Sequence, residues 1–291
     1  MSSPLEPEIA VVIVNWERPQ DTLECVRSVI ESETGHLRLR ILLVDNGSRD
    51  LSVAQISSAF PDVTIISLPE NLGFAGGYNV GIQQALLTDC DFLLLLNNDT
   101  VLDREAIQAL CSTPWDMAVP KILYYDAPRK LYAAGARWRR FPPSVVMIGY
   151  DRKENRKHQK PFPLQYATGC AFMAKRRVFE TVAGFDPDFE NYLEDYDFFY
   201  RTNQAGLSLG YVPEARVYHK VSQSLGEYSP RRWRYLGRNT VLFYRKGNRL
   251  PRWALWSQIV WFTIRETLKG NVSLIPHFSR GIREGFRYIQ R

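Results

Sequence analysis

Two aspartates of this chain come directly after short apolar runs, where a carboxylate could meet a bound ligand. Asp99 follows the run at residues 92–96 after two asparagines, and Asp45 follows the run at residues 41–44. A hard cation that holds a diphosphate prefers oxygen ligands, partly from a protein carboxylate and partly from the phosphates. Asp99 is therefore a candidate metal ligand, and Asp45 a candidate acceptor for a pyrimidine N–H or a ribose hydroxyl. The alternative is that both only close turns, where Asp and Asn are frequent.

A second acidic cluster lies at residues 192–198, where three acids stand within four positions. Carboxylates this close repel one another unless a cation, a helix N-terminus or a substrate hydroxyl relieves the repulsion. Asp195 is the candidate general base, with Glu194 beside it, and the alternative is that these acids only cap the following helix. One base suffices for transfer from a sugar nucleotide, because a metal-neutralised diphosphate leaves readily. A glycoside hydrolase needs a second, protonated carboxyl.

A histidine and a glycine-rich segment add further candidates. His219 follows a short apolar segment, and imidazole is a common ligand for manganese-like cations, although a lone histidine is more often structural. In the segment 71–79, Gly73 and Gly76 open a predicted helix whose backbone donors could face phosphates. Asn15 and Asn98 stand at strand ends and are candidates for the same nucleotide site.

The elements that must position these residues alternate in type. Apolar runs within residues 9–16, 39–45, 63–68 and 91–97 are separated by segments of helical character. Runs that are apolar on both faces indicate strands of a parallel sheet covered by helices on both sides. In such sheets ligands bind at the carboxyl ends of the strands, so the polar residues named above should share one edge. Residues 129–165 read as a strand pair followed by an exposed loop.

Charge divides the chain into two parts. Residues 228–291 hold 14 basic and 2 acidic side chains, a net charge of +12, and the rest of the chain carries −6. Such asymmetry indicates contact with an anionic surface, either lipid or nucleic acid. The apolar stretch 253–264 is too short to span a bilayer, which needs about 20 residues, but its tryptophans Trp253, Trp256 and Trp261 suit a membrane interface. The alternatives are a helix packed on the core or a homodimer contact.

The N-terminal residues and the cysteines give weaker indications. Residues 1–8 contain no basic and apolar pattern of a signal peptide, so we expect a cytoplasmic protein. The four cysteines form no CxxC pair, and we expect buried, reduced thiols.

Together these segments resemble the inverting glycosyltransferase family two of the GT-A fold, in its rhamnosyltransferase-like branch. The matching stretches, in the family's order, are residues 12–16, 44–48, 71–77, 96–100, 168–173, 184–186, 194–198 and 219–222. The resemblance implies an α/β fold with a Rossmann-like mixed sheet at residues 1–227 and a basic helical extension at 228–291.

The resemblance also implies roles. Asp45 would hold the nucleotide base or ribose, Asp99 and His219 would bind Mg²⁺ or Mn²⁺, and Asp195 would deprotonate the acceptor hydroxyl. The family's metal motif is often Asp-x-Asp, whereas this chain has Asn97 in the first position. One carboxylate fewer weakens a hard-cation site.

The donor and the acceptor follow from the resemblance alone. We expect dTDP-rhamnose first and UDP-linked sugars next, in the synthesis of bacterial surface polysaccharide at the inner face of the cell membrane. The acceptor would be a saccharide, or a sugar linked to a polyprenyl diphosphate that Arg238 and Asn239 would bind.

Three other functions compete with this one. A nucleotidyltransferase usually carries a Gly-rich, Arg-containing loop after its first strand, and residues 15–19 do not match that pattern. A nucleic-acid binder would use the basic tail but leaves the acidic clusters at the strand ends unexplained. An inactive, enzyme-like assembly subunit is the third.

Overall fold

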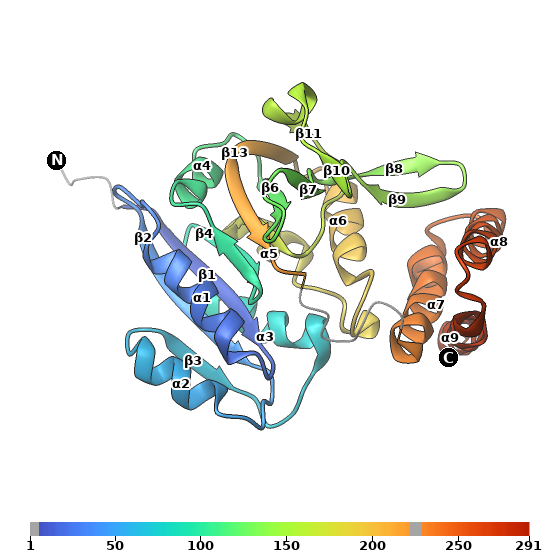
Figure 1. Ribbon diagram of the computed structural model, residues 1–291, viewed down its shortest axis with the longest axis horizontal. Coiled ribbons are helices and arrows are strands. Elements are labelled where there is room, and N and C mark those ends of the chain that lie inside the picture. Colours follow the sequence, from blue (N-terminus) through green and yellow to red (C-terminus); the bar gives the residue numbers. More distant parts are fainter. Residues whose placement is uncertain (1–5, 222–228, 291) are drawn as a thin grey trace.

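The computed structural model describes residues 6–221 and 229–290. Figure 1 shows a central sheet with helices on both faces and further helices at the end of the molecule far from β2 and β3. In the described part of the chain the main sheet has 11 strands, in the order β10-β7-β6-β12-β4-β1-β2-β3, and β13 pairs with β5, β6 and β11. Strands β8 and β9 form a separate hairpin.

The strands are β1 (Glu8–Asn15), β2 (Arg38–Asp45), β3 (Thr64–Ser67), β4 (Phe92–Asn97), β5 (Thr100–Leu102), β6 (Met117–Tyr124), β7 (Lys130–Ala133), β8 (Ala136–Arg140), β9 (Pro143–Met147), β10 (Arg152–Lys153), β11 (Phe162–Pro163), β12 (Ala171–Lys175) and β13 (Leu209–His219). The helices are α1 (Pro19–Ile30), α2 (Ser52–Ala59), α3 (Gly73–Leu86), α4 (Ala106–Cys111), α5 (Arg176–Val182), α6 (Glu194–Gln204), α7 (Pro230–Arg245), α8 (Arg252–Leu268) and α9 (Ile275–Tyr288). Short 3₁₀ turns lie at Arg156–Gln159, Pro187–Phe189, Lys246–Asn248 and Val272–Leu274.

The first half of the sheet is parallel, and its inner strands β1 and β4 are buried on both faces, as the sequence predicts. Strand β1 lies between β2 and β4 and is parallel to both. Because side chains alternate along a strand, Val11 packs in the core with α1 and α2, whereas Val12 packs in the core with α3. Helix α3 lies close to the sheet, since a Cβ at Gly77 would come within 2.9 Å of the Val14 side chain.

The second half turns the sheet into a mixed one. Strand β12 runs antiparallel to β4 and to β6, whereas β13 runs parallel to β6 and antiparallel to β5. This arrangement confirms the predicted GT-A type of α/β fold with a mixed sheet. It also places His219, at the end of β13, in register with Thr100 of β5, one residue after Asp99.

The segment 129–165 is more regular than the sequence indicates. It forms β7 to β11, and the predicted exposed loop contains a 3₁₀ turn with a buried histidine, His158. The main chain of this histidine accepts a hydrogen bond from the Tyr211 hydroxyl at 3.0 Å.

The three basic helices pack on the rest of the molecule. Trp233, Leu242 and Phe278 belong to the same core cluster as the α3 face of the sheet. Helices α7 and α9 meet through glycines, because a Cβ at Gly237 or Gly281 would collide with the backbone of the other helix. The predicted boundary between residues 227 and 228 lies outside the described residues.

Cys25, Cys90 and Cys170 are buried, as predicted, whereas Cys111 is half-buried. No helix in the described ranges is long and apolar enough to cross a membrane.

Candidate active site

A cleft of about 630 Å³ opens where β1 and β4 end. Its walls include these strand ends, the start of α3, residues 168–170, the loop that leads into α6, the end of β13 and the helices α7 to α9. Asp99, Glu194, Asp195 and His219 all line it. Residues far apart in the sequence thus share one cavity.

Asp99 and His219 face each other in the cleft. The Asp99 Oδ1 atom lies 3.2 Å from the His219 Nε2 atom, and both side chains are buried. The Asp99 carbonyl accepts a hydrogen bond from the Lys220 amide at 2.9 Å, which ties the end of β13 to the turn after β4. Burial opposes a charged imidazole, but Cys170 and Asp99 outweigh it and raise the pKa of His219 to about 10.

Within residues 6–221 and 229–290, Asp99 and His219 are the candidate metal ligands that meet at this point. Among the described residues no group of three or more His, Cys, Asp or Glu side chains is arranged to hold a metal ion. A carboxylate and an imidazole nevertheless fit a Mn²⁺ or Mg²⁺ ion whose other ligands are phosphate oxygens and water. The Nδ1 atom of His219 is buried and makes no hydrogen bond of ordinary geometry within the described residues, and the Cys170 thiol is the neighbouring group that interacts with the ring.

Asp195 is held by the backbone at the start of α6. Its Oδ2 atom accepts a hydrogen bond from the Gly169 amide at 3.0 Å, and Oδ1 accepts one from the Tyr196 amide at 2.8 Å. Burial raises the pKa of Asp195 to about 6, although these amide donors work in the opposite direction. At neutral pH the carboxylate is therefore ionised, fixed in orientation and basic enough to accept a proton.

Glu194 differs from its neighbour. It is 6% exposed, and burial together with the Asp195 and Asp197 charges raises its pKa well above the usual value. Its Oε2 atom has no hydrogen-bond partner in the described chain. Burial thus favours the protonated form of Glu194, which separates the two acids chemically.

Asn15 and Asp45 form a buried pair beneath the cleft. They are opposite each other in the β1–β2 register, and the Asn15 amide donates to the Asp45 carboxylate at 2.8 Å. Asp45 also accepts from the Ser48 amide at 3.2 Å. Their neighbours Val14, Trp16 and Asn46 line the cleft, whereas neither member of the pair does.

The glycine-rich segment plays a different part from the predicted one. The amides of Leu72, Gly73 and Phe74 already donate to asparagine side chains, and the Ala75 amide donates to the Glu190 carbonyl. Gly73 lines the cleft, but a Cβ at Gly76 would lie 2.6 Å from that of Leu72. Because these donors are taken by the protein, we correct the expectation that they face phosphates.

Asn98 and its neighbour Asn97 complete the floor of the cleft. The Asn98 amide donates to the Thr22 hydroxyl at 2.9 Å. The Tyr78 hydroxyl lies 3.1 Å from the Asn97 side-chain oxygen and donates to the Leu96 carbonyl. Asn97 is therefore held by the core of the protein.

The loop before α6 is strained and is held by α7. Glu190, Tyr192 and Leu193 all have positive φ angles, which non-glycine residues rarely adopt. The Asn239 amide nitrogen lies within 2.8 Å of the carbonyls of residues 189, 191 and 192, and Arg238 donates to the Asp188 carbonyl at 2.6 Å.

These contacts bear on Arg238 and Asn239, the two residues predicted to bind the acceptor. Asn239 is fully buried, and its amide is used by the loop that leads to Asp195. Arg238 lines a different pocket from the catalytic cleft. We therefore correct the expectation that Asn239 touches the acceptor: the structure assigns it a positioning role.

Sequence reasoning missed the part of the cleft formed by the basic helices. Arg232 is half-buried and lines the cleft, and its guanidinium lies 5.2 Å from the centre of the Tyr192 ring. Arg265 lines it from α8, together with the apolar residues Leu236, Phe262 and Phe278. The net charge of the tail indicates an anionic partner, but only the fold tells which arginines of α7 face the cleft.

Comparison with known proteins identifies the fold and the family. Residues 10–183, more than half of the chain, match the model of glycosyl transferase family 2. The structure is similar to that of GalNAc-T7 with UDP, GalNAc and Mn²⁺ (TM-score 0.60, 21% identity, 72% of this chain and 42% of that one). It is also similar to residues 1–349 of TarS from S. aureus (TM-score 0.54, 14% identity, 81% and 64%).

Two curated relatives span most of the sequence. An N-acetylglucosaminyl-diphospho-decaprenol L-rhamnosyltransferase of Mycobacterium tuberculosis is 25% identical over 278 residues, 86% of each chain. The low-salt glycan biosynthesis hexosyltransferase Agl10 of Haloferax volcanii is 23% identical over 246 residues, 80% of this chain and 76% of that one. With its GT-A fold and its match over residues 10–183, the chain belongs to glycosyl transferase family 2.

Proposed function

We propose that this protein is an inverting glycosyltransferase that moves a sugar from a nucleoside diphosphate to an acceptor hydroxyl. The observation that carries the proposal is the single cleft in which Asp195 stands with Asp99 and His219. Transfer of labelled sugar from the donor to an acceptor, with inversion at the anomeric carbon, tests it. Retention of configuration would contradict it, and so would transfer that does not depend on Asp195.

The proposed chemistry uses one proton acceptor. Asp195 takes the proton of the acceptor hydroxyl while that oxygen forms a bond to the anomeric carbon of the donor. The bond between this carbon and the diphosphate oxygen breaks, and its electron pair leaves with the nucleoside diphosphate. Attack from the face opposite the leaving group inverts the configuration. The Gly169 and Tyr196 amides hold the Asp195 carboxylate in place for this step.

Asp99 and His219 would hold a divalent cation, Mg²⁺ or Mn²⁺, together with the donor's phosphate oxygens. Such an ion would neutralise the negative charge that develops on the leaving diphosphate. Mn²⁺ is present in the GalNAc-T7 structure, which supports this assignment. Because Asn97 replaces a carboxylate, we expect the cation to bind mainly with the donor.

The donor we propose is dTDP-rhamnose, with UDP-linked sugars as the alternative. The rhamnosyltransferase relative supports this choice. The buried pair Asn15 and Asp45 would support donor binding indirectly. It would fix the strand ends and the loop that carry the cleft residues Trp16 and Asn46. A thermal-shift panel of nucleoside diphosphates, with and without Mn²⁺, tests the donor, because a bound ligand raises the apparent stability.

The acceptor we propose is a sugar linked through a diphosphate to a polyprenyl chain. The decaprenol-linked acceptor in the name of the Mycobacterium relative supports it. In the cleft, Arg232 would bind the diphosphate, and the apolar side chains of Leu236, Phe262 and Phe278 would meet the first part of the lipid. Arg232 replaces Arg238 in this role because Arg232 faces the same cavity as Asp195.

Replacing Arg232 with glutamine should raise the KM for a diphosphate-linked acceptor by about tenfold or more, the size of a lost charge-assisted hydrogen bond. The KM for the same saccharide without its diphosphate should change little. Steady-state kinetics with both acceptors measures the difference, and Arg283→Gln, which removes an exposed arginine of α9, is the matched control. Equal effects on both acceptors would contradict the assignment.

Helix α8 is the surface that we propose to contact a membrane. Trp253, Trp256, Val260, Ile264 and Leu268 are 52% to 83% exposed. Their spacing of three and four residues places them along one face of the helix. Figure 1 shows α8 at the end of the molecule far from β2 and β3. Trp261, the third predicted tryptophan, is instead half-buried, with Arg139 over its ring at 4.2 Å.

An apolar face between basic flanks fits an anionic lipid surface, and we propose that the protein lies at the inner face of the cell membrane. The double variant Val260→Glu and Ile264→Glu should bind vesicles with anionic lipid at least about tenfold more weakly, because it places two charges in the exposed apolar face that would enter the lipid. Co-sedimentation measures this. Leu51→Glu with Leu87→Glu, two exposed residues elsewhere, is the control.

Two outcomes would contradict the membrane proposal. One is unchanged vesicle binding by the α8 double variant. The other is a wild-type protein that sediments as a dimer and becomes a monomer in the α8 variant, which would make this face a homodimer contact.

A further inference from the structure

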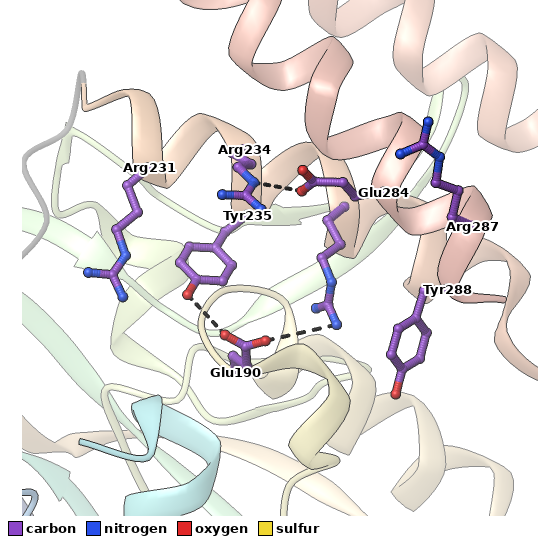
Figure 2. A pocket seen from close by; sticks show the side chains of 8 residues that line it. Glu190, Arg231, Arg234, Tyr235, Glu284, Arg287 and Tyr288 are labelled. Carbon is purple, nitrogen blue, oxygen red and sulfur yellow. Dashed lines mark hydrogen bonds and ion pairs between the residues drawn. The ribbon is translucent and has the colours of Figure 1, made fainter. Parts of the chain in front are cut away.

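A second pocket lies between α7 and α9, outside the catalytic cleft (Figure 2). It has a volume of about 460 Å³. Most of its lining side chains are charged: Glu190, Arg231, Arg234, Tyr235, Arg238, Glu284, Arg287 and Tyr288. Helix α7 therefore presents one set of side chains to this pocket and another, which includes Arg232, to the catalytic cleft.

The pocket carries an excess of positive charge. Its four arginines and two glutamates give a net charge of +2. Glu284 pairs with Arg234 at 2.6 Å, and Glu190 lies 3.9 Å from Arg238 and accepts from the Tyr235 hydroxyl at 2.9 Å.

Both carboxylates are thus engaged, which leaves two arginines unmatched. Within residues 6–221 and 229–290, Arg231 and Arg287 have no ion pair with a carboxylate, and Arg231 only stacks over the Tyr235 ring. Figure 2 shows these two arginines on different helices at the two sides of the pocket. Like charges held together in a concave site repel one another and destabilise the folded protein unless an anion neutralises them.

We propose that this pocket binds the phosphate groups of an anionic ligand, at a site separate from the catalytic cleft. Guanidinium groups match phosphate oxygens in geometry as well as in charge, and form paired hydrogen bonds with them. The two unmatched arginines would contact the phosphates, while Glu190 and Glu284 keep the inner arginines in place. The phosphate can belong to a lipid headgroup or to a soluble diphosphate, and the chemistry of recognition is the same.

Binding of inorganic diphosphate to the full chain tests the site. Calorimetry in EDTA keeps metal-assisted binding in the catalytic cleft out of the signal. The double variant Arg231→Gln and Arg287→Gln should bind diphosphate at least about tenfold more weakly than wild type, since each arginine contributes charge-assisted hydrogen bonds. Arg283→Gln, an exposed arginine on α9 with no ion pair in the described chain, should bind as wild type does.

Vesicles separate the two sources of phosphate. If the ligand is a headgroup, the double variant should also bind phosphatidylglycerol vesicles about tenfold more weakly than Arg283→Gln does, with no difference on phosphatidylcholine. If only diphosphate binding falls, the ligand is soluble.

The proposal is overturned if neither diphosphate nor vesicle binding differs between the double variant and Arg283→Gln. Thermal midpoints of all variants show whether each one is folded. Failure here leaves the proposed transfer reaction untouched, because none of the three arginines lines the catalytic cleft.

Discussion

Asp195→Asn should lower kcat by about 10²- to 10⁴-fold, the usual contribution of a positioned general base. The amide cannot accept a proton, but it keeps the shape of the side chain, so the donor should still bind. Single-turnover transfer of labelled sugar measures the rate, and a thermal shift with the nucleoside diphosphate measures binding. A chain that serves only as an assembly subunit would show no transfer in either form.

The pH dependence of the wild type gives a second test of the same residue. Burial raises the pKa of Asp195 to about 6, and only the ionised form can accept the proton. The kcat/KM for the acceptor should therefore be level above this pH and fall about tenfold for each unit below it. A profile that stays level down to pH 5 would show that another group is the base.

Glu194→Gln distinguishes the two neighbouring acids. Because burial raises the pKa of Glu194 well above its usual value, the protonated form of its carboxyl is favoured, and glutamine is close to that form in shape and polarity. We expect a much smaller loss of kcat than in Asp195→Asn. If Glu194→Gln loses as much activity, the acid–base roles are the reverse of those proposed.

Asp99→Asn should lower kcat/KM for the donor by at least about 100-fold. Removing a residue that only supports a metal ligand already lowers metal affinity or activity by about 10- to 100-fold, and Asp99 is proposed to bind the metal directly. The amide keeps an oxygen in place but removes the charge that a hard cation prefers. The stronger readout is binding: Mn²⁺ should no longer increase the thermal shift that the nucleoside diphosphate produces.

Asp103→Asn is the matched control for this change. It removes the same charge four residues later, at a half-buried position that does not line the cleft. It should leave the effect of Mn²⁺ intact. An Asp99→Asn protein that still responds to Mn²⁺ like the wild type would remove Asp99 from the metal site.

The parallel half of the sheet could be predicted because the hydrophobic pattern that specifies each strand is local. Runs such as residues 92–96 are apolar on both faces, which only a covered strand tolerates. The polar residues that follow such runs then share one edge of the sheet. Predicting that Asp99, Asp195 and His219 share one site required the order of the family motifs as well. Strand β13 pairs with β5 across more than 100 residues of sequence, and no local pattern reports such a pairing.

The rest depends on contacts between distant segments. Whether Arg232 or Arg238 faces the catalytic cleft is decided by how α7 is rotated, and glycines such as Gly237 and Gly281 set that rotation by letting α7 and α9 touch. Asn239 looked like a ligand residue because it follows an arginine, whereas its amide holds a strained loop 50 residues earlier. Neither fact has a signature in the local sequence.

The family match ends at residue 183, yet one wall of the cleft comes from α7 to α9. The cleft is therefore assembled from residues inside the matched part, such as Asp99, and from residues beyond it, such as Asp195 and His219. A chain whose C-terminal helices were exchanged for others would need to retain Asn239, because its amide holds the loop that leads to Asp195.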